Sequence, residues 1–216
     1  MGAFPGKWRS LALGFGAKSS AGLHDIQAPE VGLWALAQDV VATPGGAAAL
    51  LLAAVQAQVA RGEDLTAAFL SAHGRAQREL NTPGARIVAL RRHGNSFELA
   101  WVGAMRAFLV RQRRVLTLTR DIDGGGGGYL VTTERMSQLG APGRTRPKID
   151  RNLVNAQKGD YLVLCGDQVD EPVLHDTLPA CLHGLWSFDY KARRVQDVLN
   201  KHSTAPGRVV ICQALK

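Results

Sequence analysis

Several features that define common classes of protein are scarce in this sequence. No apolar run approaches the roughly 20 residues that a membrane-spanning helix needs, and the longest, at residues 47–55, soon meets two glutamines. The three cysteines, Cys165, Cys181 and Cys212, form no CxxC pair and no even set. The cysteines indicate buried, reduced thiols in a cytoplasmic protein and argue against a disulfide framework. The short apolar runs argue against an integral membrane protein.

Signals for zinc, nucleotides and nucleic acid are also weak. The six histidines show no HExxH motif and no His/Cys spacing suited to zinc. Five glycines at 124–128 lack the Lys-Ser/Thr pair of a phosphate-binding loop and indicate a flexible hinge at most. Aromatic residues make up 6% of the chain and the residues behind its net charge of +8 are scattered, which argues against a nucleic-acid groove.

What the sequence does contain is typical of a globular protein. Hydrophobic residues make up 46% and charged residues 20% of a chain of 216 residues. This length and composition favour one folded domain that spans residues 1–216.

The first half of the chain predicts strands followed by two helices. Runs at 10–15 and 31–37 have strand composition, and the polar stretch between them predicts a turn or loop. Apolar residues at helical spacing follow at 47–61 and 65–80, and Asp64 is placed to cap the second helix.

The second half returns to the period of strands. Four short β-prone runs joined by turn-like segments predict an antiparallel meander. These runs lie at 86–90, 97–102, 107–110 and 115–118. Residues 121–155 predict flexible loops with a short helix around 134–139. A strand at 161–165, a helix at 190–202 and a strand at 208–214 complete the pattern, which favours an α+β sandwich over a parallel sheet.

Motifs within these elements follow a recognisable order. LWALAQDVVA stands where a known family has a strand ending in Ala-Asp-Gly, and the long helix PGGAAALLLAAVQAQVA follows it. WVGAMRAFLV stands in place of a Gly-Asp-Ser-Arg strand, KGDYLVLCGDQVDEPV in place of a strand ending in Ser-Asp-Gly, and GRVVICQA in place of the last strand. Along nearly its whole length the chain resembles the bacterial PPM (type 2C) family of metal-dependent Ser/Thr protein phosphatases.

This resemblance implies a sandwich of two antiparallel β-sheets flanked by α-helices, with two Mg²⁺ or Mn²⁺ ions at one edge. It also implies that most of the metal site is lost. The aspartate that bridges the ions in the family falls on Gln38, with Asp39 one position later, and two further aspartates fall on Ala104 and Ala205. Because neighbouring residues of a strand point to opposite faces, Asp39 cannot replace the lost ligand without a local bulge.

Asp167 persists at a ligand position, and Asp25 matches an acidic position near the start of the family pattern. These two residual candidates should not balance the charge of two divalent cations, which require several anionic oxygens. We therefore expect no bound metal and no hydrolysis. An alternative interpretation of Asp167 is structural, as a cap on a turn.

Three arginines are candidates for contact with a partner or a phosphate group. Arg106 matches the arginine of the Gly-Asp-Ser-Arg pattern, where an ion pair or packing at a strand start is the alternative. Arg144 and Arg146 lie in a basic stretch that corresponds to a variable flap beside the family's active site. The planar guanidinium group suits phosphate oxygens, and solvated loop charge is the alternative.

The sequence thus predicts a pseudophosphatase: a cytoplasmic, catalytically inactive, phosphatase-like protein that needs no cofactor and acts as a regulatory or protein-binding module. The resemblance implies a protein partner, a phosphoprotein or a kinase-linked component of bacterial signalling or secretion. The alternative is an active phosphatase with an altered Mg²⁺ or Mn²⁺ centre built on Asp167, Asp39 and Asp25. Nucleic-acid binding through the positive charge is a third hypothesis, and it predicts a strong dependence on salt.

Overall fold

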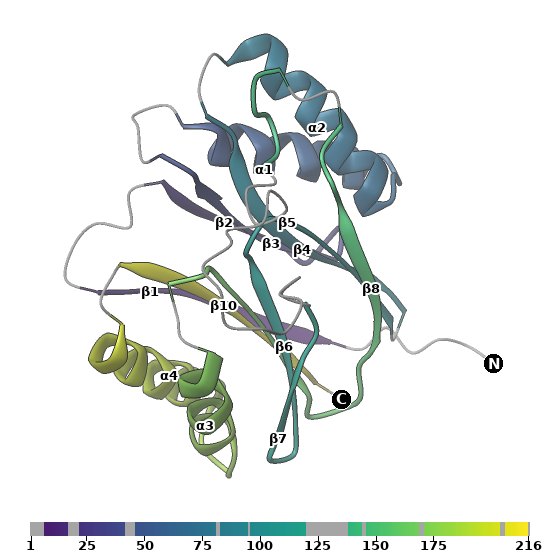
Figure 1. The fold of residues 1–216 in the computed structure, drawn as a ribbon. Coiled ribbons are helices and arrows are strands. Elements are labelled where there is room, and N and C mark those ends of the chain that lie inside the picture. The colour runs from purple at the N-terminus through teal and green to yellow at the C-terminus, as the bar shows by residue number, and fades with distance from the viewer. Residues whose placement is uncertain are drawn as a thin grey trace, which may run out of the picture.

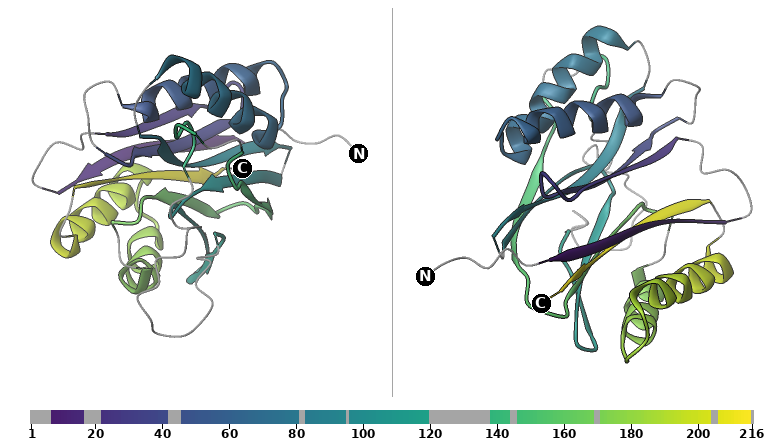
Figure 2. Two further views of the ribbon diagram at one scale, coloured as in Figure 1. Left: turned by 45° about the horizontal axis from the view of Figure 1, so that its top comes forward. Right: turned by 180° about the vertical axis from the view of Figure 1, so that it is seen from behind.

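The computed structural model describes residues 7–16, 22–41, 46–80, 83–94, 96–119, 138–143, 146–168, 171–203 and 206–215. In this part of the chain, two five-stranded antiparallel sheets face each other, with two helices on the outer face of each (Figure 1). Figure 2 shows the same four layers from two further directions. The predicted α+β sandwich is confirmed.

The first sheet has the strand order β2-β3-β4-β5-β8, and helices α1 and α2 cover it. Its strands are β2 (Leu23–Ala28), β3 (Leu33–Asp39), β4 (Ala85–His93), β5 (Ser96–Val102) and β8 (Asp150–Asn155). The helices are α1 (Ala47–Ala60) and α2 (Leu65–Glu79), at the top of Figure 1.

The second sheet has the order β1-β10-β9-β6-β7, and helices α3 and α4 cover its outer face. Its strands are β1 (Trp8–Phe15), β6 (Arg106–Arg111), β7 (Arg114–Thr117), β9 (Tyr161–Cys165) and β10 (Gly207–Ala214). The helices are α3 (Glu171–Leu182) and α4 (Phe188–His202).

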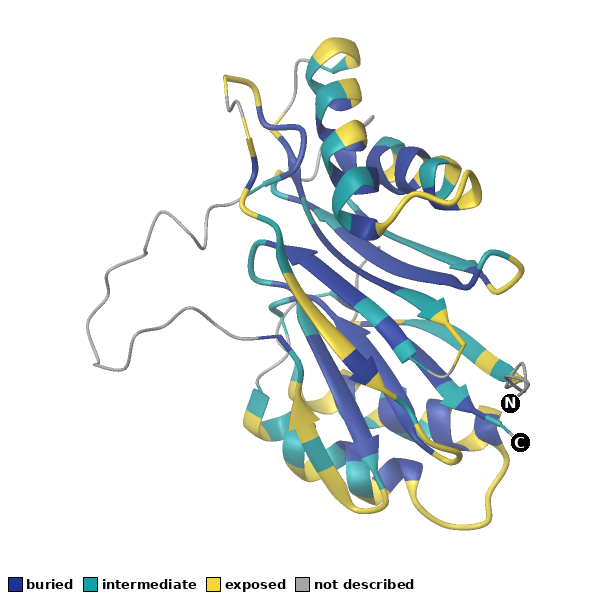
Figure 3. Ribbon diagram, turned by 90° about the vertical axis from the view of Figure 1, so that its right-hand side faces the viewer, coloured by how far each residue is buried: buried dark blue, intermediate teal, exposed yellow. Residues whose placement is uncertain are grey.

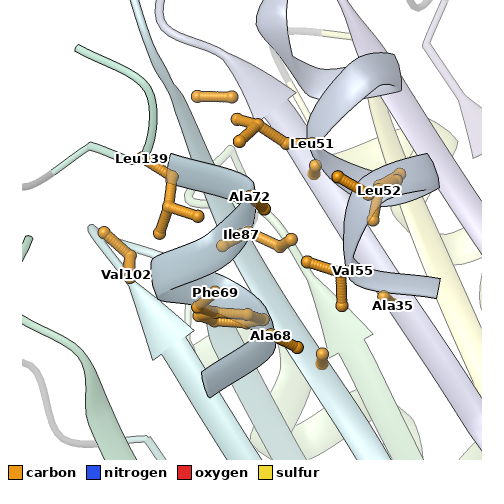
Figure 4. Close-up of a cluster of buried hydrophobic side chains, with 14 of the residues drawn as sticks. Ala35, Leu51, Leu52, Val55, Ala68, Phe69, Ala72, Ile87, Val102 and Leu139 are labelled. Atoms are coloured by element: carbon orange, nitrogen blue, oxygen red, sulfur yellow. The ribbon is translucent and has the colours of Figure 1, made fainter. Parts of the chain in front are cut away.

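Alternation along β3 divides its side chains between two layers of the core. Leu33, Ala35 and Ala37 pack beneath α1 and α2, in the layer drawn in Figure 4. Trp34 and Leu36 point the other way, toward the second sheet. Figure 3 shows the result, with buried strands inside and exposed residues on the outer turns of the helices.

Local capping explains where two of the helices begin. Asp64 precedes α2, and its Oδ1 accepts a hydrogen bond of 2.7 Å from the N–H of Ala67, which confirms the predicted cap. Ser187 precedes α4, and its Oγ accepts from the N–H of Tyr190 at 3.2 Å. The cap of α1 comes from a strand and is part of the site described below.

Three elements lie where the sequence predicted none. Strand β2 lies in the stretch predicted as a loop, because half of its residues are polar and most of them are only half-buried at the edge of the sheet. Strand β8 is also an edge strand and is mostly exposed, so it lacks the apolar alternation of an inner strand. Helix α3 contains Pro179 in its interior, a residue that usually argues against a helix.

The predicted single meander is wrong, because the chain changes sheets between β5 and β6. Strand β5 pairs with β4 and β8 in the first sheet, whereas β6 pairs with β7 and β9 in the second. The connection contains Gly103, whose φ of 80° lies in the region that favours glycine. The four strands therefore form two hairpins in different sheets.

Some predictions fall on residues that are not described. The five glycines lie there, as does most of the helix expected at 134–139, although Leu139 is described and forms an isolated antiparallel bridge with Ala85. None of the described helices is long and apolar enough to cross a membrane. The three cysteines are free and buried, as predicted.

Candidate functional site

Strand ends from both sheets meet at one end of the sandwich. In the first sheet, the last residues of β3 pair with the first residues of β4, so that Gln38 lies opposite Arg86. In the second sheet, Arg106 at the start of β6 lies opposite Cys165 at the end of β9. This end holds most of the candidate residues, and the term "site end" is used for it below.

Gln38 points toward the second sheet. A β-carbon at Gly166, directly after β9, would lie 2.9 Å from Gln38 Oε1 and 2.3 Å from Gln168 Oε1. Both amide oxygens are buried and accept no hydrogen bond from the described residues. The absence of a side chain at Gly166 therefore leaves room for both neutral amides, and Gln38 stands at the position that the resemblance gives to a bridging carboxylate.

Asp39 points to the opposite side of β3, toward α1. Its Oδ1 accepts a hydrogen bond of 2.7 Å from the N–H of Ala48, in the first turn of α1. The carboxylate is close to Gly46, where a β-carbon would lie 2.0 Å from Oδ2. Asp39 thus caps α1 from the neighbouring strand, and only glycine fits at position 46 beside it.

Burial raises the pKa of Asp39 above its ordinary value, and the hydrogen bond from the Ala48 N–H and the nearby His24 act in the opposite direction. Its side chain is on the helix-facing side, away from the facing sheet. The altered metal centre that needs Asp39 together with Asp25 and Asp167 is therefore not assembled by this arrangement.

Asp167 and Asp25 each form an ion pair with an arginine of the other sheet. Asp167, two residues after β9, accepts a hydrogen bond from Arg86 of β4. Asp25 of β2 lies 2.9 Å from Nε of Arg208 on β10. Arg208 also donates to the carbonyl of Leu23 at 3.2 Å. Both candidate carboxylates are therefore engaged by guanidinium groups.

Arg106 lies on the helix-facing side of the second sheet, close to the start of α3. Its Nη1 is 4.0 Å from Oε2 of Glu171. Glu171 accepts a hydrogen bond of 2.6 Å from Thr117 Oγ1 and lies 3.5 Å from the ring of His175. This cluster joins β6 and β7 to α3, and it places Arg106 in a network with a nearby acid.

Of the four remaining candidates, two are described and two are not. Ala104 lies in the connection between β5 and β6 and offers only a methyl group. Arg146 is exposed, before β8. Arg144 and Ala205 lie outside the described residues.

The described residues at the site end do not fit a pair of divalent cations. Mg²⁺ and Mn²⁺ need several negatively charged oxygens at short distance. Among the described residues, no group of three or more His, Cys, Asp or Glu side chains is placed to hold a metal ion. In the part of this end that the structure describes, the carboxylates of Asp167, Glu171 and Asp25 each lie within 4.0 Å of an arginine, so that their charges are already balanced.

The reasoning from sequence missed the arginines that pair with the two aspartates. Arg86 and Arg208 each stand near the start of a strongly apolar strand, in ARIVAL and GRVVIC. An arginine at such a position indicates an acidic partner, since a charged residue in an inner strand is rarely buried without one. The sequence did not show which partner each arginine has.

Comparison with known proteins gives a match in structure and none in sequence. No protein-family model matches the chain, and no curated protein matches it significantly. Solved structures do match it over nearly their whole length, and they are Ser/Thr phosphatases of the PPM type. The chain therefore has the PPM phosphatase fold, as its motifs predicted.

Three of these structures show the extent of the likeness. PppA, described as a key regulatory component of T6SS in Pseudomonas aeruginosa, has a TM-score of 0.77 and 16% identity over 96% of this chain and 98% of its own. The Mycobacterium tuberculosis phosphatase PstP has a TM-score of 0.74 and 19% identity over 97% and 99%. The catalytic domain of PstP with two manganese ions has a TM-score of 0.72 and 19% identity over 98% and 99%. At such low identity the likeness shows the fold alone.

Proposed function

We propose that this protein is a pseudophosphatase, a cytoplasmic, non-catalytic member of the PPM fold that regulates or binds another protein. The observation that carries the proposal is the pairing at the site end, where Asp25 and Asp167 each face an arginine and Gln38 offers a neutral amide. The partner is a protein, either a phosphoprotein or a kinase-linked component of a bacterial signalling or secretion pathway.

The chemistry of the family argues for inactivity. Metal-dependent phosphate hydrolysis requires ions that lower the pKa of a bound water and stabilise the charge of the transferred group. Those ions need carboxylates that are free to bind them. A carboxylate that is already paired with a guanidinium group offers less attraction to a metal, and two amides contribute no charge. Among the described side chains of the site end, the carboxylates of Asp25 and Asp167 are already paired with arginines, which supports inactivity.

An exposed apolar cluster supports a role in binding. Between α3 and the first turn of α4, Leu185 is fully exposed, Trp186 is 60% exposed and Tyr190 is 47% exposed. The rings of Trp186 and Tyr190 lie 4.9 Å apart. Tryptophan and tyrosine are the residues that most often dominate protein interfaces. The PppA structure adds that a protein of this fold is a regulatory component.

A phosphatase assay tests the catalytic part of the proposal. Purified protein is incubated with a phosphothreonine peptide in millimolar Mn²⁺ or Mg²⁺, and phosphate release is compared with that of PstP. We expect no release above the buffer blank. Manganese-dependent turnover that disappears in Asp167→Asn would show instead an active enzyme with an altered centre.

A capture experiment tests the binding part. The tagged chain is used as bait in an extract of its native cells, beside the variant Trp186→Ser/Tyr190→Ser. The control variant Leu116→Ser/Leu153→Ser changes two other exposed apolar residues, on β7 and β8. We expect a protein that is retained by the wild type and the control variant and lost from the aromatic variant. If the wild-type chain retains no protein, the binding role is wrong.

A further inference from the structure

The two ion pairs at the site end connect the two sheets in opposite directions. Arg86 belongs to the first sheet and reaches Asp167, which follows β9 of the second sheet. Arg208 belongs to the second sheet and reaches Asp25 of β2 in the first. Each sheet therefore contributes one cation and one anion, and each contact crosses the space between the sheets.

These contacts differ from ordinary surface ion pairs in their burial. The side chains of Arg208 and Asp25 are 31% and 13% exposed, and those of Arg86 and Asp167 are 25% and 31% exposed. The pair Arg75–Glu79 on α2 is 49% and 45% exposed and joins residues one helical turn apart. Water therefore screens the charges of the two ion pairs at the site end less than it screens the charges of Arg75 and Glu79. The residues of each pair at the site end are also far apart in the sequence.

We infer that the guanidinium groups of Arg86 and Arg208 replace metal ions as the positive charges that hold this end of the sandwich together, so that the stability of the chain does not depend on divalent cations. An arginine keeps its charge at every pH at which the protein is folded. A metal that displaced it would leave a partly buried guanidinium group without a counter-ion, which is costly. The guanidinium groups of Arg86 and Arg208 therefore replace the metal ions and also prevent them from binding.

This inference goes beyond the proposed function. A non-catalytic binding module could still require manganese for its stability, and a chain with built-in cations could still lack a partner. The proposed function and this inference can therefore fail separately, and measurements of thermal stability test only the inference.

The first measurement uses the unaltered chain. Its thermal unfolding midpoint is recorded after treatment with a chelator and again in millimolar Mn²⁺ or Mg²⁺. We expect the same midpoint in all three conditions. A rise in the midpoint that saturates with manganese would overturn the inference, because it would show a site that binds the cation in the folded state.

The second measurement uses a double-mutant cycle on Asp25 and Arg208. We expect Arg208→Met and Asp25→Asn each to lower the midpoint by about 2–8 °C, and the double variant to lower it by clearly less than the sum. Arg75→Met is the matched control from the exposed pair and should lower it by less than about 2 °C. Additive losses in the double variant would contradict the inference, as would an effect of Arg208→Met no larger than that of the control.

A charge exchange covers the case in which a single variant does not fold. The variant Asp25→Arg/Arg208→Asp keeps one cation and one anion at the same two positions. We expect it to be more stable than either Asp25→Arg or Arg208→Asp alone. If the exchanged variant is no more stable than these single variants, the contact between the sheets is not what stabilises this end.

Discussion

The clearest test that Asp39 caps α1 is to change its carboxylate in two ways. Asp39→Ala removes the oxygen that accepts the N–H of Ala48 at 2.7 Å. Asp39→Asn keeps an oxygen of nearly the same size in the same place but removes the charge. The position is 6% exposed, so water cannot replace the lost acceptor easily.

The magnitude follows from the geometry of the cap. Loss of a side-chain cap costs about 0.5–2 kcal/mol, and a buried N–H left without a partner adds to that cost. We expect Asp39→Ala to lower the free energy of unfolding by about 1–3 kcal/mol. Asp39→Asn should cost less than about 1 kcal/mol at neutral pH, because it retains the acceptor and removes a charge that burial disfavours.

The dependence on pH has a definite sign. Burial raises the pKa of Asp39 above its ordinary value of 3.8, so the folded state binds this proton more tightly than the unfolded state does. As the pH falls through the raised folded pKa toward 3.8, the wild type should therefore gain stability relative to Asp39→Asn. Above the folded pKa the difference between the two proteins should be constant.

Urea denaturation followed by tryptophan fluorescence measures the free energy of unfolding of the wild type and of both variants. Repeating it at neutral and at mildly acidic pH measures the pH dependence. Asp39 does not cap α1 if Asp39→Ala is as stable as the wild type, or if Asp39→Asn lowers the free energy of unfolding as much as Asp39→Ala does. If manganese stabilises the wild type but not Asp39→Asn, Asp39 is a metal ligand and not a helix cap.

Three further predictions follow from the described contacts. Arg111→Met should lower the free energy of unfolding by about 2–4 kcal/mol, because it leaves the 2%-exposed carboxylate of Asp160 without its bidentate partner, and urea denaturation measures the loss. The thiol of Cys165, whose pKa burial raises to about 12, should react with a thiol reagent only after unfolding, so that labelling of the native protein at this residue would contradict its burial. Phe69→Ala should cost about 3–5 kcal/mol, since Phe69 of α2 is fully buried in the layer between the helices and the first sheet, and a loss below about 1 kcal/mol would show that this layer repacks.

The order of the motifs was enough to predict the fold, because each motif stands on an element with a strong local signal. Helices α1 and α2 have apolar residues at helical spacing, and β9 is apolar throughout. The elements that were missed are those with weak local signals. Strands β2 and β8 lie at sheet edges, where polar residues are tolerated, and α3 contains a proline.

The alternation of a strand was enough to separate Gln38 from Asp39. The sequence predicted that the two side chains point to opposite faces, and the structure places Asp39 under α1 and Gln38 beside Gly166. The sequence did not predict that Asp39 caps α1, since Ala48 comes close to Asp39 only when the helix folds back over β3.

The sequence alone was enough to predict the sandwich fold, its strongly apolar strands and helices, and the loss of carboxylates, because each of these depends on which residue type stands at which place in a local pattern. Only the tertiary structure decided what balances the charge of the carboxylates that remain. Arg86 is 81 positions away from Asp167, and Arg208 lies at the opposite end of the chain from Asp25. Partners so distant meet only because the two sheets stack face to face, and no local pattern records that contact.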